Sequence, residues 1–431
     1  MAISLDHPAL VSNRHASMAE GSPAGRPGLS EGQVSAAEPF AFGLCAGRYM
    51  PACDTVSART TAVLFAAPWG LEELSTRKFF RLVADRLSHR GIASLRFDVP
   101  GTGDSLDPPS FAGGLAVWRD SLIEAAGWLK MQGFRKVILV GQGLGASLAL
   151  QSSPQIADLA GLALLAPVLS GRAYLRELSV WAKVVDDSLN LKAEDRQPSG
   201  VTSIASLVMP PEIAAEVGRM KLSVPEQTAS VPCLLLERPA QIGADAFAEA
   251  LDASRFAVER HPFDGYEALI AGPINARIPQ DVVDRLVSWI DDQAPRSGEA
   301  QPPARIALPV GSTLQADLFS ETGVRFGESM RLAGVLCQPV RATQKPAVLF
   351  FGSAYDRHSG WGRLTTETAR RLAAEGIPSL RFDCANVADS PPEMTAPAQV
   401  LYAPAQERDA QAALDFLSLA LPDAPILAVG R

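Results

Sequence analysis

Hydrophobic positions along the chain alternate between short continuous runs and longer periodic stretches. Residues 62–67 (AVLFAA) form an apolar run of strand length, as expected for a strand buried on both faces of a parallel sheet. Residues 75–89 then place Phe79, Val83 and Leu87 at intervals of four, with charged residues between them. This spacing predicts an amphipathic helix that packs one face against the sheet.

The same alternation of strand and helix continues through the first two thirds of the chain. It predicts a mostly parallel sheet with helices on both faces, an α/β fold, because parallel neighbours need right-handed helical crossovers. The stretch between residues 169 and 230 breaks the alternation and is interpreted as a helical insertion in the position of a lid. The further predicted strands are 92–97, 136–140, 159–168, 232–236 and 256–262, and the further predicted helices are 115–131 and 282–290.

Two stretches rich in Pro, Gly, Ser and Ala divide the chain. Residues 1–37 show no helical or strand period and no signal-peptide pattern, so we expect a flexible tail. Residues 293–313 have a similar composition and are predicted to be an inter-domain linker. The first domain is therefore expected to span residues 38–292 and the second to begin at residue 314.

The chain repeats part of itself. A shift of 285 residues lays residues 347–390 over residues 62–105 without a gap, with 16 identities in 44 positions. The unbroken register across two strands and a helix indicates a duplicated domain. At a slightly longer offset, Val429-Gly430 match Val140-Gly141, so residues 314–431 are expected to form the front half of a second domain. Such an incomplete sheet would have an unpaired edge and is expected to favour self-association.

Composition narrows the function classes. The net charge of −8 argues against a surface for nucleic acid or anionic lipid, because no basic excess exists to neutralise phosphates. No apolar run approaches the ~20 residues of a membrane helix. The five cysteines are scattered, without a C-x-x-C pair, so neither a disulfide framework nor a zinc site is indicated. We expect a cytoplasmic protein that needs no metal or other cofactor.

A motif follows the predicted strand 136–140 directly. It reads Gly141-Gln142-Gly143-Leu144-Gly145 and enters a helix, which is the context of a nucleophile elbow, G-x-S-x-G. Together with the turn from Asp98 to Ser105 (DVPGTGDS) and the order of elements, this motif resembles the α/β-hydrolase superfamily, in particular its serine-aminopeptidase-like branch. The resemblance covers about residues 38–292 and again about 315–431.

The resemblance implies an enzyme that hydrolyses acyl esters or amides, with a small acyl compound as its ligand. The elbow residue would attack the carbonyl, but Gly143 stands at that position and has no side chain to attack with. The oxyanion would be stabilised by the backbone N–H of Leu144 and by that of Trp69 or Gly70, since Pro68 cannot donate.

The other catalytic positions are also degenerate. Glu237 is the acidic residue nearest the position of the catalytic acid, although a surface carboxylate paired with Arg238 is the preferred interpretation. The loop that would carry the histidine, residues 264–269, contains none. His261 lies earlier, inside a predicted strand, and is a weak candidate for a base. The remaining histidines are His7 and His15 in the tail, His89 at a helix end and His358 in a polar loop.

The second copy keeps two acidic turn positions of the first. Asp98 and Asp104 correspond to Asp383 and Asp389, and we expect all four to stabilise strand-end turns through nearby backbone N–H groups. His358 is expected to be a solvated loop residue, with contact to a ligand as the alternative.

Three functional hypotheses stay open. In the first, the complete protein is a hydrolase whose activity lies in a completed second copy. In the second, the first copy is a non-catalytic pseudo-hydrolase that binds a ligand or partner. In the third, the chain is an ordinary hydrolase that has lost only its elbow serine. The absence of a histidine from residues 264–269 counts against the last, because one substitution cannot explain both absences.

Overall fold

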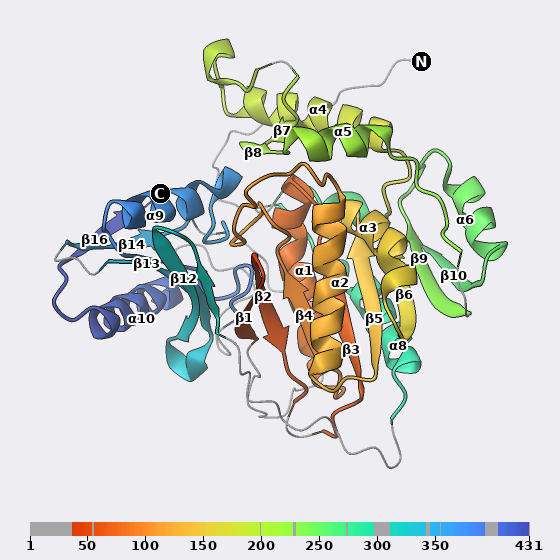
Figure 1. Ribbon diagram of the computed structural model, residues 1–431, viewed down its shortest axis with the longest axis horizontal. Helices are drawn as coiled ribbons and strands as arrows, with labels where there is room; N and C mark the ends of the chain where they lie inside the picture. The colour runs from red at the N-terminus through yellow and green to blue at the C-terminus, as the bar shows by residue number, and fades with distance from the viewer. Residues whose placement is uncertain are drawn as a thin grey trace, which may run out of the picture. The chain divides into compact units, whose positions relative to one another are not determined.

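The computed structural model describes residues 37–430 apart from 54–55, 199, 227–229, 273–274, 297–310, 342–344, 354 and 393–403 (Figure 1). These residues belong to one compact unit, residues 34–431. Residues 1–36 of the predicted tail, with His7 and His15, and residues 297–310 of the predicted linker lie outside the described residues.

The larger sheet has eight strands in the order β1-β2-β4-β3-β5-β6-β9-β10. Strand β2 is antiparallel to both of its neighbours, and the other strands pair in parallel. This order and the predominantly parallel pairing form an α/β-hydrolase-like fold, as predicted. The strands are β1 (Glu38–Phe42), β2 (Cys45–Met50), β3 (Thr61–Ala66), β4 (Ser94–Phe97), β5 (Lys136–Gln142), β6 (Leu159–Leu165), β9 (Val231–Glu237) and β10 (Phe256–Pro262).

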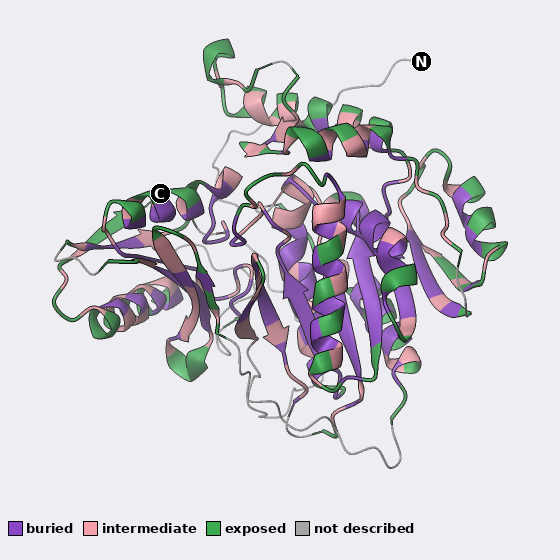
Figure 2. Ribbon diagram, viewed as in Figure 1, coloured by how far each residue is buried: buried purple, intermediate pink, exposed green. Residues whose placement is uncertain are grey.

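Helices cover both faces of this sheet and create two hydrophobic cores (Figure 2). One core includes Trp118 and Leu122, and the other includes Phe79, Val83 and Leu87, which are fully buried as the predicted helical stripe requires. The helices are α1 (Leu71–Ser88), α2 (Ala116–Met131), α3 (Leu144–Ser152), α6 (Ala244–Asp252), α7 (Tyr266–Leu269) and α8 (Gln280–Gln293), with a 3₁₀ turn η1 (Ser153–Gln155).

The insertion between β6 and β9 lies above the larger sheet in Figure 1 and is largely helical, as expected. It also contains a two-stranded hairpin that the sequence pattern did not predict. The lid approaches the start of α1, because a Cβ on Gly70 would lie 3.0 Å from Ile204 and 3.9 Å from Leu178. Its elements are α4 (Gly171–Ser188), η2 (Ala193–Asp195), β7 (Ser203–Ile204), β8 (Leu207–Val208) and α5 (Pro211–Arg219).

The second sheet has six strands in the order β11-β12-β13-β15-β14-β16. From β12 onward this order matches β1-β2-β4-β3-β5. The pairing register matches too: Leu64 lies opposite Leu95, and Leu349, 285 residues later, lies opposite Leu380. The elements are β11 (Thr313–Gln315), β12 (Phe319–Phe326), η3 (Glu328–Met330), β13 (Leu332–Pro339), β14 (Ala347–Phe351), η4 (Trp361–Arg363), α9 (Leu364–Ala374), β15 (Ser379–Phe382), α10 (Pro404–Ala420) and β16 (Ile426–Gly430).

Candidate functional site

The elbow motif forms a tight turn between β5 and α3. Gly143 has a φ of +55°, in the region that favours glycine. A Cβ on Gly141 would lie 2.5 Å from the Cα of Ala146, and one on Gly145 would lie 2.3 Å from the carbonyl oxygen of Ala66. The flanking glycines are therefore required by close backbone approach, so the elbow geometry persists although its nucleophile is absent.

A carboxyl group occupies the space that a nucleophilic side chain would use. A Cβ on Gly143 would lie 2.5 Å from Oε2 of Glu72, in the first turn of α1. The Nε2 of Gln142 donates to Oε1 of Glu72 at 2.9 Å, and the Tyr266 hydroxyl donates to the same oxygen at 3.3 Å. Sequence reasoning missed Glu72; its signal is an acidic residue directly after the loop of Trp69 and Gly70.

The surroundings of Glu72 keep it partly protonated near neutral pH. Burial raises its pKa to about 7, although the hydrogen bonds from Gln142 and Tyr266 and the charge of Arg238 act in the opposite direction. Burial and the nearby Glu72 carboxylate also raise the pKa values of Tyr174 and Tyr266. Both phenols therefore stay protonated as potential hydrogen-bond donors beside the carboxyl.

An ion pair connects the lid to the body of the domain next to this site. The two terminal nitrogens of Arg238 donate to the two carboxylate oxygens of Glu177 in α4, at 2.8 and 2.6 Å. The Arg238 guanidinium also lies 5.2 Å from the centre of the Tyr266 ring. Because this bidentate pair uses the charge of Arg238, no ion pair among the described residues is left for Glu72.

The predicted oxyanion donors lie at helix starts. Leu144 is the first residue of α3, and Trp69 and Gly70 directly precede α1. Leu144 and Trp69 are buried, at 1% and 6% exposure. Backbone N–H groups at helix N-termini are oriented to receive negative charge, so their role as oxyanion donors stays a prediction consistent with this placement.

The predicted acid and base are held by other partners. Glu237 accepts hydrogen bonds from Arg260, at 2.9 Å for the shortest, so the expected pairing with Arg238 is wrong. His261 lies with Nε2 2.7 Å from Glu259 and Nδ1 2.8 Å from Arg285. In the described part of the chain, no hydrogen bond joins either candidate to the elbow residues.

Two of the four turn aspartates behave as expected. Oδ2 of Asp98 accepts from the backbone N–H of Asp104 at 3.0 Å, and Oδ2 of Asp383 accepts from that of Asp389 at 3.2 Å, which confirms their predicted role in strand-end turns. The same expectation is wrong for Asp104 and Asp389, because their carboxylates accept from arginines of the other sheet. Ala388 takes the place of a turn glycine yet has a φ of +37°, so the second turn keeps the backbone shape of the first.

Ion pairs between the two sheets also form at these turns, which the sequence analysis did not predict. Nη1 of Arg96 in β4 donates to Asp389 at 2.6 Å, and Nη2 of Arg381 in β15 donates to Asp104 at 3.1 Å. Arg96 and Arg381 are equivalent under the shift of 285 residues, and so are Asp104 and Asp389. The contact is therefore reciprocal, as in a two-fold symmetric interface.

His358 is part of this contact, and the expectation of a solvated loop residue is wrong. Its imidazole is fully buried, with Nε2 2.7 Å from Asp104 and Nδ1 2.9 Å from Asp383. Burial opposes the charged form, but the two carboxylates outweigh it and raise the pKa of His358. His358 therefore connects the two acidic turns as a buried cation.

Further arginines complete the cluster and shift its carboxyl groups. Despite burial, the pKa values of Asp104 and Asp389 are held well below their usual range by their cationic neighbours. The additional contacts include Arg77 with Asp98 and Asp389, Arg357 with Asp98 and Asp104, Arg81 with Asn386 and the Ala388 carbonyl, Arg363 with the Gly101, Gly103 and Ser105 carbonyls, and Arg370 with Glu321 and the Asp104 carbonyl.

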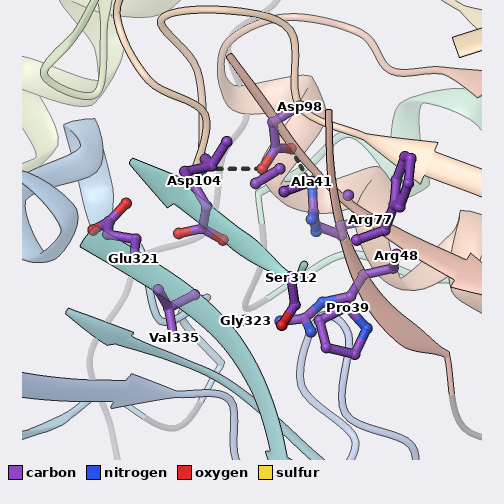
Figure 3. A pocket seen from close by; sticks show the side chains of 14 residues that line it. Pro39, Ala41, Arg48, Arg77, Asp98, Asp104, Ser312, Glu321, Gly323 and Val335 are labelled. Atoms are coloured by element: carbon purple, nitrogen blue, oxygen red, sulfur yellow. Dashed lines mark hydrogen bonds and ion pairs between the residues drawn. The ribbon is translucent and has the colours of Figure 1, made fainter. Parts of the chain in front are cut away.

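A small cavity lies inside the cluster and is shown in Figure 3. Its volume is about 20 Å³, and its lining includes Arg48, Arg77, Asp98, Asp104 and Glu321. This space holds about one water molecule. The charged cluster is thus an interface between the two sheets and not a pocket for a substrate. A larger open groove of about 1050 Å³, between residues 221–226 and α6, has neither Gly143 nor Glu72 in its lining.

Three other features bear on function. The described residues contain no group of three or more His, Cys, Asp or Glu side chains placed to hold a metal ion. Among the same residues, no helix is both long and apolar enough to span a bilayer. Four of the five cysteines are buried, and Cys384 is partly exposed.

Comparisons with known proteins found likenesses at low identity among solved structures. No family model matches the chain, and no curated protein sequence matches it. Among solved structures, a soluble variant of monoglyceride lipase from Saccharomyces cerevisiae is 14% identical, with a TM-score of 0.41, over 63% of this chain and 100% of its own. Est1E from Butyrivibrio proteoclasticus is 14% identical, with a TM-score of 0.38, over 60% and 99%. We base no functional conclusion on likenesses at this level.

Proposed function

We propose that the larger sheet is a non-catalytic α/β-hydrolase-like module, duplicated in tandem, whose elbow has become a binding site and whose acidic turn holds the second sheet. One observation carries the proposal: the Glu72 carboxyl lies where the nucleophile's side chain would be, 2.5 Å from a Cβ on Gly143. An acyl carbonyl would have to approach through that space.

The missing base supports the same proposal. Serine hydrolysis needs a group that takes the proton of the nucleophile, within hydrogen-bond reach. His261 instead contacts Glu259 and Arg285, and His358 lies between Asp104 and Asp383. Restoring a hydroxyl alone would therefore not restore the reaction.

The buried charges support the scaffold part of the proposal. Removing the second sheet would leave Asp98 and Asp104 without Arg357 and His358, and Arg96 without Asp389. Buried charges deprived of their partners are strongly unfavourable. The two sheets are therefore expected to unfold and function as a pair.

Hydrolysis assays test the proposal. Wild-type protein is expected to turn over p-nitrophenyl acyl esters no faster than a boiled control, and Gly143→Ser is expected to resist labelling by a fluorophosphonate probe. Gly143→Ser combined with Glu72→Ala removes the overlap with the carboxyl and should still not be labelled, because His261 and His358 are held by other partners. Saturable turnover by the wild type, or robust labelling of a folded serine variant, contradicts the proposal.

A second candidate function places serine chemistry in the second domain. The pairing of β14 with β16 puts Phe351 opposite Gly430, as the pairing of β3 with β5 puts Ala66 opposite Gly141. The position equivalent to Gly143 is therefore two residues after Gly430. A codon there for Ser or Cys, followed two codons later by one for Gly, would favour this candidate, and reading the gene decides it.

A further inference from the structure

The elbow site contains hydrogen-bonding atoms that the protein itself does not satisfy. Gln142 is fully buried, and its Oε1 has no hydrogen-bond partner among the described residues. The buried hydroxyl of Tyr174 in the lid likewise has none. Oε2 of Glu72, the oxygen that faces the elbow, accepts none of the hydrogen bonds that the structure describes, since both known donors reach Oε1.

One of these atoms belongs to the Glu72 carboxyl, and the other two come from side chains near it. The amide of Gln142 is fixed there by its 2.9 Å bond to Oε1 of Glu72. Tyr174 is close enough to the Glu72 and Glu177 carboxylates for their charges, after burial, to raise the pKa of its phenol. Buried polar atoms without partners are rare in folded proteins and usually mark a ligand or an ordered water. Two of the three are pure acceptors, and the third is a hydroxyl that can accept.

The charge balance points the same way. The cation nearest Glu72 is Arg238, whose two terminal nitrogens are used by Glu177. An anionic ligand would face the Glu72 carboxylate without a free cation to offset it. A ligand that brings its own positive charge and several N–H donors would satisfy both the charge and the acceptors.

We propose that the elbow site binds a primary ammonium group, held by Oε2 of Glu72, Oε1 of Gln142 and the hydroxyl of Tyr174. An ammonium has three N–H donors and no acceptor, which matches the three unsatisfied oxygens. The inference rests on the proposed non-catalytic function, because a nucleophile at position 143 would occupy the same space.

Binding should depend on pH in a defined direction. An ammonium ligand needs Glu72 ionised, and burial raises the pKa of Glu72 to about 7. The groups facing Glu72 are Gln142, Tyr266, Tyr174, Arg238 and Glu177; the pKa values of both tyrosines and Arg238 are raised, so these three keep their protons near neutral pH. Affinity should therefore fall about thirtyfold from about pH 8 to about pH 5.5.

The test uses the full chain and n-propylammonium as the probe, with calorimetry as the readout and n-propanol and propionate as matched neutral and anionic probes. We expect saturable binding of the ammonium alone, with the stated pH dependence. Glu72→Gln should abolish binding, and Glu249→Gln, an equally conservative change at an exposed carboxylate in α6, should leave it unchanged.

The wild-type measurements decide the inference even if Glu72→Gln does not fold. Equal binding of propanol, or no binding of the ammonium at about pH 8, overturns it. Ester turnover by the same preparation is measured separately, so that turnover overturns the proposed function, whereas an absence of ammonium binding without turnover overturns this inference alone.

Discussion

Asp389 tests directly whether buried charges hold the two sheets together. Its side chain is fully buried and accepts from Nη1 of Arg96 at 2.6 Å and from Nε of Arg77 at 2.8 Å, while Arg48 lies 3.9 Å away. Asp389→Asn keeps the shape but removes the charge, which leaves buried arginines uncompensated. Breaking a buried pair in this way costs about 3–5 kcal/mol.

Urea unfolding measures that cost. If the free energy of unfolding falls by about 3 kcal/mol for each molar of urea, the midpoint of Asp389→Asn should move down by about 1–1.7 M. Asp158→Asn is the matched control, because Asp158 is 62% exposed and pairs with Lys130 at the surface; its midpoint should not move measurably. Equal midpoints for Asp389→Asn and the wild type would refute the reasoning.

The effect of Asp389 should also depend on pH. The cationic neighbours hold its pKa well below 3.8 against the effect of burial. Its contribution to stability is therefore present above the pKa of the unfolded chain and is lost as the pH falls through the folded value. The difference between wild type and Asp389→Asn should be constant near neutral pH and shrink only under strongly acidic conditions.

Four further substitutions give distinct outcomes. His358 has a raised pKa, so its stabilising charge is fully present below pH 6.5 and is lost as the pH rises; melting temperatures should show this alkaline loss in the wild type and not in His358→Gln. Glu72 has a pKa of about 7 instead of 4.5, so the wild type should lose at most about 3 kcal/mol as the pH rises between those values, and urea unfolding of Glu72→Gln should show no such loss. Ala388→Gly should raise the unfolding free energy by about 0.5–1 kcal/mol, because glycine relieves a φ of +37°, whereas Gly103→Ala should lower it, since its Cβ would lie 2.2 Å from Asp98; opposite signs would contradict the equivalence of the two turns.

Local pattern predicted the parallel strands and their helices well. The strand predicted at 256–262 matches β10, and the helix predicted at 115–131 differs from α2 by one residue. Continuous apolar runs of fully buried strands such as β3 are easy to recognise, whereas β10 was predicted although most of its residues are exposed or half-buried. The antiparallel strands β1, β2 and β11 to β13 were not predicted. Strand β11 has only three residues, and the other four carry Gly, Arg or Pro among their apolar residues.

The site was predicted only in part, because its decisive contacts join distant residues. Gly143 and its flanking glycines follow from a local motif, but the overlap with Glu72 depends on how α1 packs beside β5. The buried charges had a signal that was overlooked: Ser-Leu-Arg-Phe occurs in both β4 and β15, with an arginine inside an otherwise buried strand. A charge kept in such a position predicts a buried partner.

The reciprocal ion pairs between the two sheets have a consequence for sequence variation. Position 96 depends on position 389, and position 381 depends on position 104, across 293 and 277 residues. A neutralising change at one member leaves its partner without compensation until a second change follows. Among related chains that keep both sheets, these two pairs of positions should therefore co-vary. Amino-acid substitution at these positions in one sheet should be restrained by the residues of the other.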